Sequence, residues 1–269
     1  ARVNLRCPDK IVLISPAIAV SRYASIANLH GAISWIPYFE KYAWFSIYPE
    51  IDPFKFSSFP KRAGREIYNL SQRVLGTLED TARAGELPPT LAFQSMVDST
   101  VGSMALTGIL YNRLPANGSK QVLYDVNRGD AMLHLMLDLP DEAMDTLPAG
   151  APFAYDITVV KNRDNKSAFV DLLTLPAGST EPHIAQTTMQ WPDGVYSLSH
   201  IALPFRPDDQ LYGDGEYSNN AKSEIVIGAL SPRGESGVLA LPPAYFLRVR
   251  HNPFHQYQTQ EMIRWLASE

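Results

Sequence analysis

An aspartate and a histidine stand in sequence surroundings that suit acid–base chemistry. Asp98 follows the apolar run Thr90 to Gln94 and precedes a segment of helical spacing, which predicts a loop after a buried strand. Open α/β sheets bind ligands at such carboxyl ends, where a carboxylate can hold the Nδ1 hydrogen of an imidazole during acyl transfer. His200 follows the short apolar strand Val195 to Leu198 and is the candidate general base. Helix capping by Asp98 is the alternative interpretation.

The other histidines compete with His200 for the role of base. His251 is the second candidate. His251 and His255 share a short segment, but Pro253 separates them and the glutamate of a zinc-protease helix motif is missing, so no metal site is expected there. The remaining three are interpreted as residues of an aromatic-rich segment, a weak helix and a loop: His30, His134 and His183.

The nucleophile is harder to assign than the acid and the base. No Gly-x-Ser-x-Gly motif occurs, and the segment Gly234 to Gly237 lacks both its spacing and a preceding strand. A rival alignment takes Ser95 as nucleophile and Asp164 as acid, which satisfies the chain order Ser, Asp, His. Its weakness is steric, because the strained turn of a nucleophile needs small neighbours and Gln94 and Met96 are large.

Two further patterns are given structural interpretations. Ser58 to Lys61 matches the Ser-x-x-Lys pattern of serine acylases, but Pro60 lies inside what should be a helix, so a chance match is favoured. An acidic cluster lacks the register of an EF-hand and is interpreted as a solvated loop: Asp208, Asp209, Asp214 and Glu216. No metal and no cofactor are predicted.

The overall composition excludes several classes of protein. Of 269 residues, 45% are hydrophobic and 19% charged, which is typical of a packed globular protein. A net charge of −5 with scattered Lys and Arg residues argues against nucleic acid as a partner. Cys7 is the single cysteine, so no internal disulfide forms. The longest apolar run, Ile11 to Val20, is interrupted by Ser15 and Pro16 and is too short to span a membrane.

The elements that must position Asp98 and His200 alternate between strand and helix patterns. Strands are predicted at residues 10–15, 90–94, 121–126 and 195–198, helices at 62–84, 101–113 and 254–267, and an antiparallel hairpin at 156–160 and 168–175. The helix between the second and third strands predicts a parallel βαβ unit with a right-handed crossover. Less regular patterns predict an aromatic segment at 22–60, a weak helix at 129–150 and a strand at 224–229.

The order of these segments from Lys10 to Val126 resembles the C-terminal portion of the α/β-hydrolase superfamily. Lys10 to Pro16 is similar to the sixth strand of that family, after which a cap is usually inserted. The loop that contains Asp98 is similar to its seventh-strand loop, which carries the acid of the catalytic triad. Gln121 to Val126 is similar to its eighth strand. The resemblance implies an α/β fold with a mostly parallel sheet of α/β-hydrolase type.

The chain departs from the family after the last of these strands. The family's histidine belongs there, but Asp125 to Arg128 contains none, so His200 takes its place in this alignment. The implied arrangement is a single domain, residues 1–269, with an aromatic-rich cap at about residues 18–60 and an inserted antiparallel hairpin at about residues 127–190 ahead of the histidine loop.

The family's nucleophile precedes its sixth strand. The alignment therefore places the nucleophile upstream of Ala1 and implies a domain that is incomplete at the N-terminus, with an N-terminal polypeptide or a second copy completing the sheet. The implied activity is hydrolysis of carboxylic esters with an apolar group by a Ser-His-Asp triad, in which Asp98 orients His200 and His200 activates the serine. The alternative is a non-catalytic binding or interaction protein on a hydrolase scaffold.

Overall fold

The fold is given by a computed structural model of the 269-residue chain. It describes residues 8–18, 43–47, 56, 58–83, 85–98, 103–130, 152–214, 230–232 and 247–268. The helices among these residues are α2 (Lys61–Arg83), α3 (Ser103–Ile109) and α5 (His255–Ala267), with a short 3-10 helix at Tyr111–Arg113.

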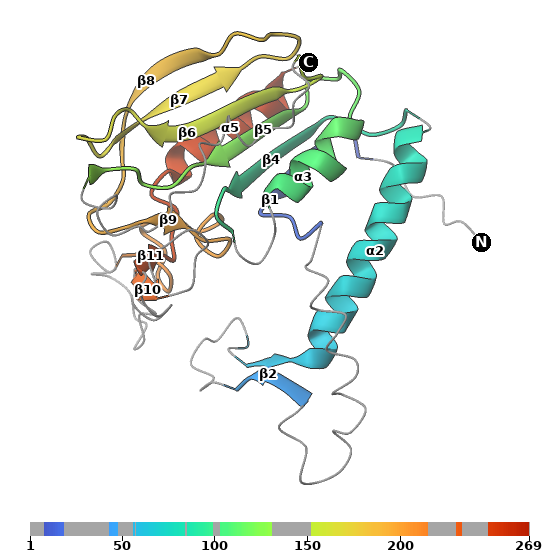
Figure 1. The fold of residues 1–269 in the computed structure, drawn as a ribbon, viewed down its shortest axis with the longest axis horizontal. Helices are drawn as coiled ribbons and strands as arrows, with labels where there is room; N and C mark the ends of the chain where they lie inside the picture. The colour runs from blue at the N-terminus through green and yellow to red at the C-terminus, as the bar shows by residue number, and fades with distance from the viewer. Residues whose placement is uncertain are drawn as a thin grey trace.

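A six-stranded mixed sheet forms the centre of the described structure (Figure 1). Its strands, in spatial order, are β1 (Ile11–Ile14), β4 (Thr90–Ser95), β5 (Lys120–Tyr124), β6 (Asp156–Asn162), β7 (Phe169–Leu175) and β8 (His183–Gln190). The first four run parallel, whereas β7 and β8 are antiparallel to their neighbours. The chain is therefore an α/β protein, and the carboxyl ends of β1, β4, β5 and β6 share one edge of the sheet.

Helices cover both faces of the parallel part of the sheet. In Figure 1, α3 lies in front of the strands and α5 lies behind them. Burial on both faces explains why all six residues of β4 are buried and why its centre, Leu91 to Phe93, is continuously apolar rather than alternating. β1 lies at the outer side of the described sheet, and its four apolar residues are only partly buried.

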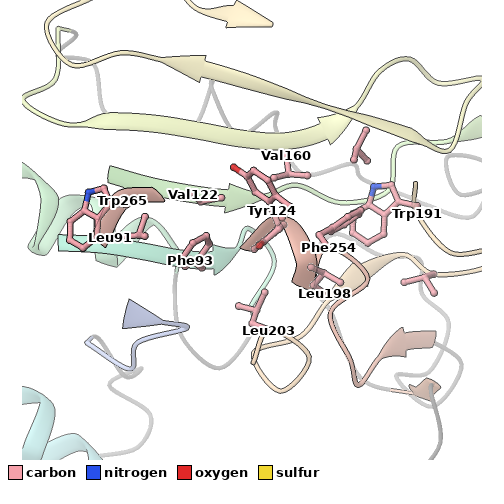
Figure 2. Packing of buried hydrophobic residues seen from close by; sticks show 13 residues of the cluster. Leu91, Phe93, Val122, Tyr124, Val160, Trp191, Leu198, Leu203, Phe254 and Trp265 are labelled. Carbon is pink, nitrogen blue, oxygen red and sulfur yellow. The ribbon is translucent and has the colours of Figure 1, made fainter. Parts of the chain in front are cut away.

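The hydrophobic core consists of one large cluster on each face. On the α5 face, Leu91 and Phe93 of β4 pack in one cluster with Phe254 and Trp265 (Figure 2). On the α3 face, Ala92 belongs to a second cluster, which includes Leu106, Leu110, Leu123 and Ile157. Adjacent residues of a strand point to opposite faces, so a single strand contributes to both clusters.

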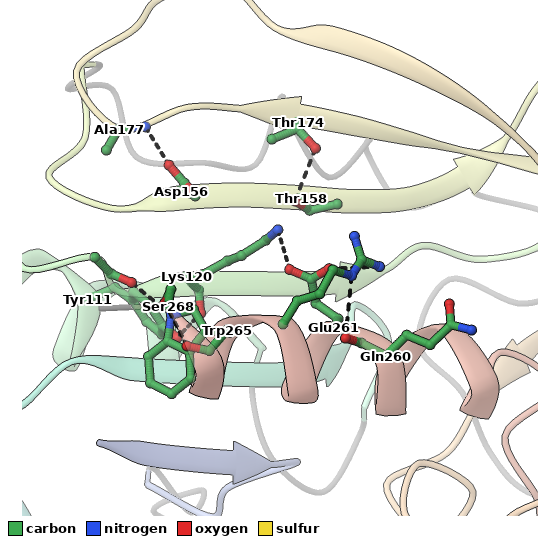
Figure 3. Close-up of polar contacts among 12 residues, drawn as sticks. Tyr111, Lys120, Asp156, Thr158, Thr174, Ala177, Gln260, Glu261, Trp265 and Ser268 are labelled. Atoms are coloured by element: carbon green, nitrogen blue, oxygen red, sulfur yellow. Dashed lines mark hydrogen bonds and ion pairs between the residues drawn. The ribbon is translucent and has the colours of Figure 1, made fainter. Parts of the chain in front are cut away.

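Polar contacts fix α5 on the sheet at its C-terminal half. The ammonium of Lys120 donates to Oε1 of Glu261 at 2.6 Å, and the indole of Trp265 donates to the carbonyl of Gly118 at 2.8 Å. Figure 3 shows Lys120 reaching from β5 toward Glu261 on the helix. Both contacts lie near the amino end of β5, opposite the edge where Asp98 follows β4.

Several of the predicted elements are confirmed. The amphipathic helix predicted at 62–84 is α2, which spans Lys61–Arg83. The strands predicted at 90–94 and 121–126 are β4 and β5, and the predicted hairpin consists of β6 and β7. The helix predicted at 101–113 is shorter than expected, because α3 ends at Ile109 and a 3-10 turn follows. Residues 99–102 lie outside the described residues.

The region from residue 127 to 190 adds one finding to the predicted hairpin and corrects one prediction. β6 pairs in parallel with β5, so the antiparallel hairpin extends the main sheet. The loop predicted around His183 is wrong, because His183 begins β8. β8 carries mostly exposed side chains, so it is held by backbone pairing with β7 and has no buried face to mark it in the sequence.

Smaller elements complete the described structure. β9 (Ser197–Leu198) pairs in parallel with β11 (Leu247–Val249), which pairs antiparallel with β10 (Leu230–Pro232). Most of the predicted cap, residues 18–60, lies outside the described residues, and its described part contains the antiparallel pair β2 (Trp44–Ser46) and β3 (Phe59–Pro60). The helix predicted at 129–150 and the strand predicted at 224–229 also fall largely or wholly outside them.

Candidate active site

The structure brings Asp98 and His200 together at the carboxyl edge of the parallel strands. Nδ1 of His200 lies 3.9 Å from Oδ1 of Asp98. A hydrogen bond between such atoms spans about 2.7–3.2 Å, so a small movement of the ring converts this contact into one. Catalytic hydrogen bonds are often long without substrate and tighten in the substrate complex. The pair therefore has the geometry from which a carboxylate can orient an imidazole.

The two side chains differ in their exposure to solvent. The Asp98 side chain is 1% exposed, whereas that of His200 is 27% exposed. A buried carboxylate holds a fixed position, and a partly exposed imidazole can reach a substrate with its other nitrogen. This division matches the roles of orienting acid and general base.

The loop after β4 fixes Asp98 through its backbone and a neighbouring strand. The amide of Met96 donates to the carbonyl of Tyr124 at 2.9 Å, which prolongs the parallel ladder beyond β4. The amide of Asp98 then donates to the carbonyl of Ser95 at 3.4 Å and closes a turn. Val97 packs with Val126 and Tyr196 in a small apolar cluster. The loop is therefore anchored on both sides of the aspartate.

His200 lies in a turn that buried residues fix at both ends. Leu198 and Leu203 are fully buried and belong to the α5-face cluster. Between them, the amide of Ala202 donates to the carbonyl and to the hydroxyl of Ser199, each at 3.1 Å. This Ser turn fixes the backbone around His200, whose side chain is 27% exposed.

The histidine segment runs beside the end of β5, although it comes much later in the chain. The amide of Asn127 donates to the carbonyl of Tyr196 at 2.7 Å, and its side chain donates to the carbonyl of Val195 at 2.9 Å. Asn127 follows the strand after which the α/β-hydrolase resemblance expects the histidine. β6, β7 and β8 thus lie between two segments that meet at the end of β5, and the His200 turn follows the second of these segments.

A buried polar network connects α5 to the His200 turn. Gln258 of α5 is fully buried and donates to the carbonyl of Leu203 at 3.0 Å. Its carbonyl oxygen accepts hydrogen bonds from the hydroxyl of Tyr124 at 3.0 Å and from the amide of Asn252 at 2.9 Å. Because Tyr124 ends β5, the network holds the sheet edge, the helix and the histidine turn in one arrangement.

Sequence reasoning missed one residue at this edge. Ser15 follows β1, and its hydroxyl donates to Oδ2 of Asp98 at 2.9 Å. Its φ of 47° is the only positive value at a non-glycine residue in the described part of the chain. Its only mark in the sequence is a serine at the end of an apolar strand, directly before Pro16.

The rival nucleophile and acid occupy different surroundings. Ser95 is the last residue of β4 and is 1% exposed, and its hydroxyl has no hydrogen-bond partner among the described residues. Asp164 lies in the exposed turn between β6 and β7, where its carboxylate accepts the amide of Lys166 at 2.8 Å. A turn-forming aspartate in solvent lacks the buried, fixed position that Asp98 has.

The second histidine candidate is buried near the start of α5. His251 is 5% exposed, and burial is the main cause that lowers its pKa below the ordinary value of 6.5. The nearby charge of Asp214 and the backbone of Tyr212 act in the opposite direction and are weaker. Burial also lowers the pKa of His255, the first residue of α5. His30 and His134 lie outside the described residues.

The remaining sequence motifs have structural surroundings. Ser58 precedes β3 and Lys61 begins α2, so Pro60 ends a strand directly before the helix. In the acidic loop, Asp209 accepts the amides of Leu211 and Tyr212 at 3.0 and 2.8 Å, as a turn-forming aspartate does. Within the described part of the chain, no group of three or more His, Cys, Asp or Glu residues could hold a metal ion. Glu216 and residues 234–237 lie outside that part.

Comparisons with family models, curated proteins and solved structures found no match for this chain. None of its helices, over the ranges that the structure describes, is long and apolar enough to cross a membrane. The resemblance to α/β-hydrolases thus stays a prediction, and the candidate site is defined by its geometry.

Proposed function

We propose that this protein is a serine hydrolase of the α/β-hydrolase type that acts on carboxylic esters, with Asp98 as acid and His200 as base. The observation that carries the proposal is the 3.9 Å approach of His200 Nδ1 to Asp98 Oδ1 at the carboxyl edge of the sheet. Asp98 and His200 come from distant parts of the sequence and lie together. The acid is the more buried of the two and the base the more exposed, as their proposed roles require.

The proposed chemistry assigns one function to each nitrogen of His200. Nδ1 donates its hydrogen to Asp98, which fixes the tautomer in which Nε2 is free to accept a proton. Nε2 takes the proton of a serine hydroxyl as the serine attacks the ester carbonyl, and returns it to the departing alcohol. Water then attacks the acyl-enzyme with His200 again as base.

The substrate proposal is an ester with an apolar acyl or alcohol group. It rests on the aromatic segment from residue 22 to 60, which the resemblance identifies as a cap. In its described part, Trp44, Phe56 and Phe59 are 39%, 87% and 41% exposed. Exposed aromatic side chains of this kind suit contact with an apolar ligand.

The nucleophile is not assigned to any described serine. The half-buried apolar strand β1, at the outer side of the described sheet, supports the proposal that another stretch of polypeptide, or a second copy, lies against it and supplies the serine.

The proposal is tested with a fluorophosphonate probe on the protein purified from its natural source. The probe labels only an activated serine, and mass spectrometry of the digested protein locates it. We expect one serine to be labelled, with the rate falling about 10²–10⁴-fold in His200→Ala because the general base is lost. His183→Ala, at an exposed histidine on β8, is the matched control and should label normally.

Two results would contradict the proposal. Equal labelling rates in His200→Ala and the unmodified protein would exclude His200 as the base. A protein that is folded, binds apolar esters and is never labelled would instead be the non-catalytic binding protein.

A further inference from the structure

We infer that Ser15 is a positioning residue that holds the Asp98 carboxylate in the orientation His200 requires, an inference that rests on the proposed function. Its hydroxyl donates to Oδ2 at 2.9 Å, while Oδ1 of the same carboxylate faces His200 Nδ1. A carboxylate held at one oxygen by a donor on a neighbouring strand cannot rotate its other oxygen away without breaking that bond. Ser15 therefore acts on the base only through the acid.

The backbone conformation at Ser15 directs this hydroxyl toward Asp98. Its amide donates to the carbonyl of Phe93 at 2.8 Å, which prolongs the pairing of β1 with β4 by one residue. The chain then turns sharply, with φ at 47° and Pro16 next. Such a conformation costs an L-residue other than glycine about 1 kcal/mol or more and persists where the surroundings enforce it. The turn brings the side chain over the carboxyl edge toward the loop after β4.

The same surroundings argue against Ser15 as the nucleophile. In an α/β-hydrolase elbow, the backbone amide after the nucleophile stabilises the oxyanion. Pro16 has no amide hydrogen, so this donor is missing. The hydroxyl also donates to the acid, whereas a nucleophilic serine donates to the histidine. The strained serine thus serves the acid of the triad.

The experiment compares two variants that separate the hydroxyl from the backbone. Ser15→Ala removes the hydroxyl and keeps a side chain in the strained conformation, whereas Ser15→Gly removes the hydroxyl and relieves the strain. Hydrogen bonds to charged groups stabilise strongly enough that we expect both variants to lose about 10–100-fold in kcat toward p-nitrophenyl esters, with KM nearly unchanged. The acidic limb of the kcat/KM profile should move to lower pH in both, because a displaced carboxylate stabilises the protonated imidazole less.

Ser119→Ala is the matched control. Ser119 is also buried, donates to Asn117 Oδ1 at 2.6 Å and accepts the amide of Thr90 at 3.0 Å, but it lies at the opposite, amino edge of the same strands. Loss of its hydroxyl should lower the urea midpoint and leave kcat and the pH profile unchanged. If Ser15→Ala lost no more kcat than Ser119→Ala does, the positioning role of Ser15 would be overturned.

Asp98→Asn separates failure of this inference from failure of the proposed function. A large loss of kcat in Asp98→Asn, together with wild-type kcat in Ser15→Gly or in both Ser15 variants, would overturn the role of Ser15 alone. An unchanged kcat in Asp98→Asn would overturn the proposed function and the role of Ser15 with it. Adding Ser15→Ala to Asp98→Asn should cost clearly less than Ser15→Ala alone, because the two residues act as a unit.

Discussion

The parallel and antiparallel parts of the sheet present different surfaces to solvent. β4 is buried along its whole length, so a side chain that acts on a ligand must lie beyond its end, as Asp98 does in the following loop. β8, at the far side of the antiparallel part, exposes most of its side chains, and the buried Asp171 of β7 forms an ion pair with Arg163 of the adjoining turn. The candidate site therefore lies at the end of the parallel part. The antiparallel strands β7 and β8 precede the segment that carries His200 to that site.

The buried polar residues of the two parts also differ in the range of their contacts along the sequence. At the parallel edge, buried polar groups are tied to segments far apart in the sequence, as the bonds of Gln258 and Asn127 show. In the antiparallel part, the ion pair joins residues on neighbouring segments of one hairpin. Changes at the parallel edge should therefore alter catalysis, and changes in the hairpin should alter stability alone.

The largest effect is expected for Asp98→Asn. An amide in place of the carboxylate favours the wrong histidine tautomer, so we expect kcat for ester hydrolysis to fall about 10⁴-fold with the fold intact. Steady-state kinetics and circular dichroism measure the two outcomes. Asp156→Asn, the same substitution at the start of β6, is the control and should keep full activity. Comparable kcat values for the two variants would show that the carboxylate at position 98 has no special role in catalysis.

A smaller effect on catalysis but a clear effect on stability is expected for Gln258→Leu. The change leaves the carbonyl of Leu203 without the Gln258 donor and the Tyr124 hydroxyl without its acceptor, which we expect to lower the free energy of unfolding by about 1–3 kcal/mol. Because the His200 turn loses its anchor, kcat should fall as well, though less than in Asp98→Asn. Urea unfolding and kinetics test this, with the exposed Gln256→Leu on the same helix as control. Unchanged kcat with reduced stability would show that the network does not position His200.

The smallest effect is expected in the antiparallel part, for Arg163→Met. The guanidinium of Arg163 hydrogen-bonds both carboxylate oxygens of Asp171, and these bonds are the main cause that lowers the pKa of Asp171 below its ordinary value of 3.8. Loss of the guanidinium should lower the urea midpoint at neutral pH, by less than Gln258→Leu does, and leave kcat unchanged.

The sign of the pH dependence follows from the lowered pKa of Asp171. The unfolded chain takes up the proton first, so the stabilisation is complete well above pH 3.8 and is lost as the pH falls through the lower pKa of the folded protein. The stability difference between the two proteins should therefore shrink in acid. Arg206→Met, in an exposed pair with Asp208, should change stability less at any pH. A fall of kcat in Arg163→Met would contradict the separation of the two regions.

Elements with a local signal could be predicted from the sequence. The helical spacing of apolar residues in α2 and the apolar centre of β4, which is buried on both faces, are each a pattern within a short stretch of sequence. β8 gave no such signal, because it has no buried face and depends on hydrogen bonds with β7. The parallel pairing of β6 with β5 also leaves no mark in the sequence of the hairpin.

The candidate site was predictable to a similar extent. Asp98 could be found because a carboxylate after a buried strand is a local pattern, and His200 because an imidazole follows a short strand before an apolar stretch. Asn127 and Gln258, which bond to the chain before and after His200, have no such local pattern and could not be singled out. Ser15 escaped notice because its role depends on a positive φ and a contact 83 positions away in the chain.

The bond between Asn127 and Val195 has a consequence for how the protein folds. It spans 68 positions of sequence, and closing a loop of that length without intervening structure costs conformational entropy that grows with the logarithm of its length. Docking β6, β7 and β8 first divides that loop into short steps, so we expect the His200 turn to join the sheet late. A chain emerging from the ribosome would then carry Asp98 long before it carries a paired His200, and the proposed acid–base activity would require the completely folded chain.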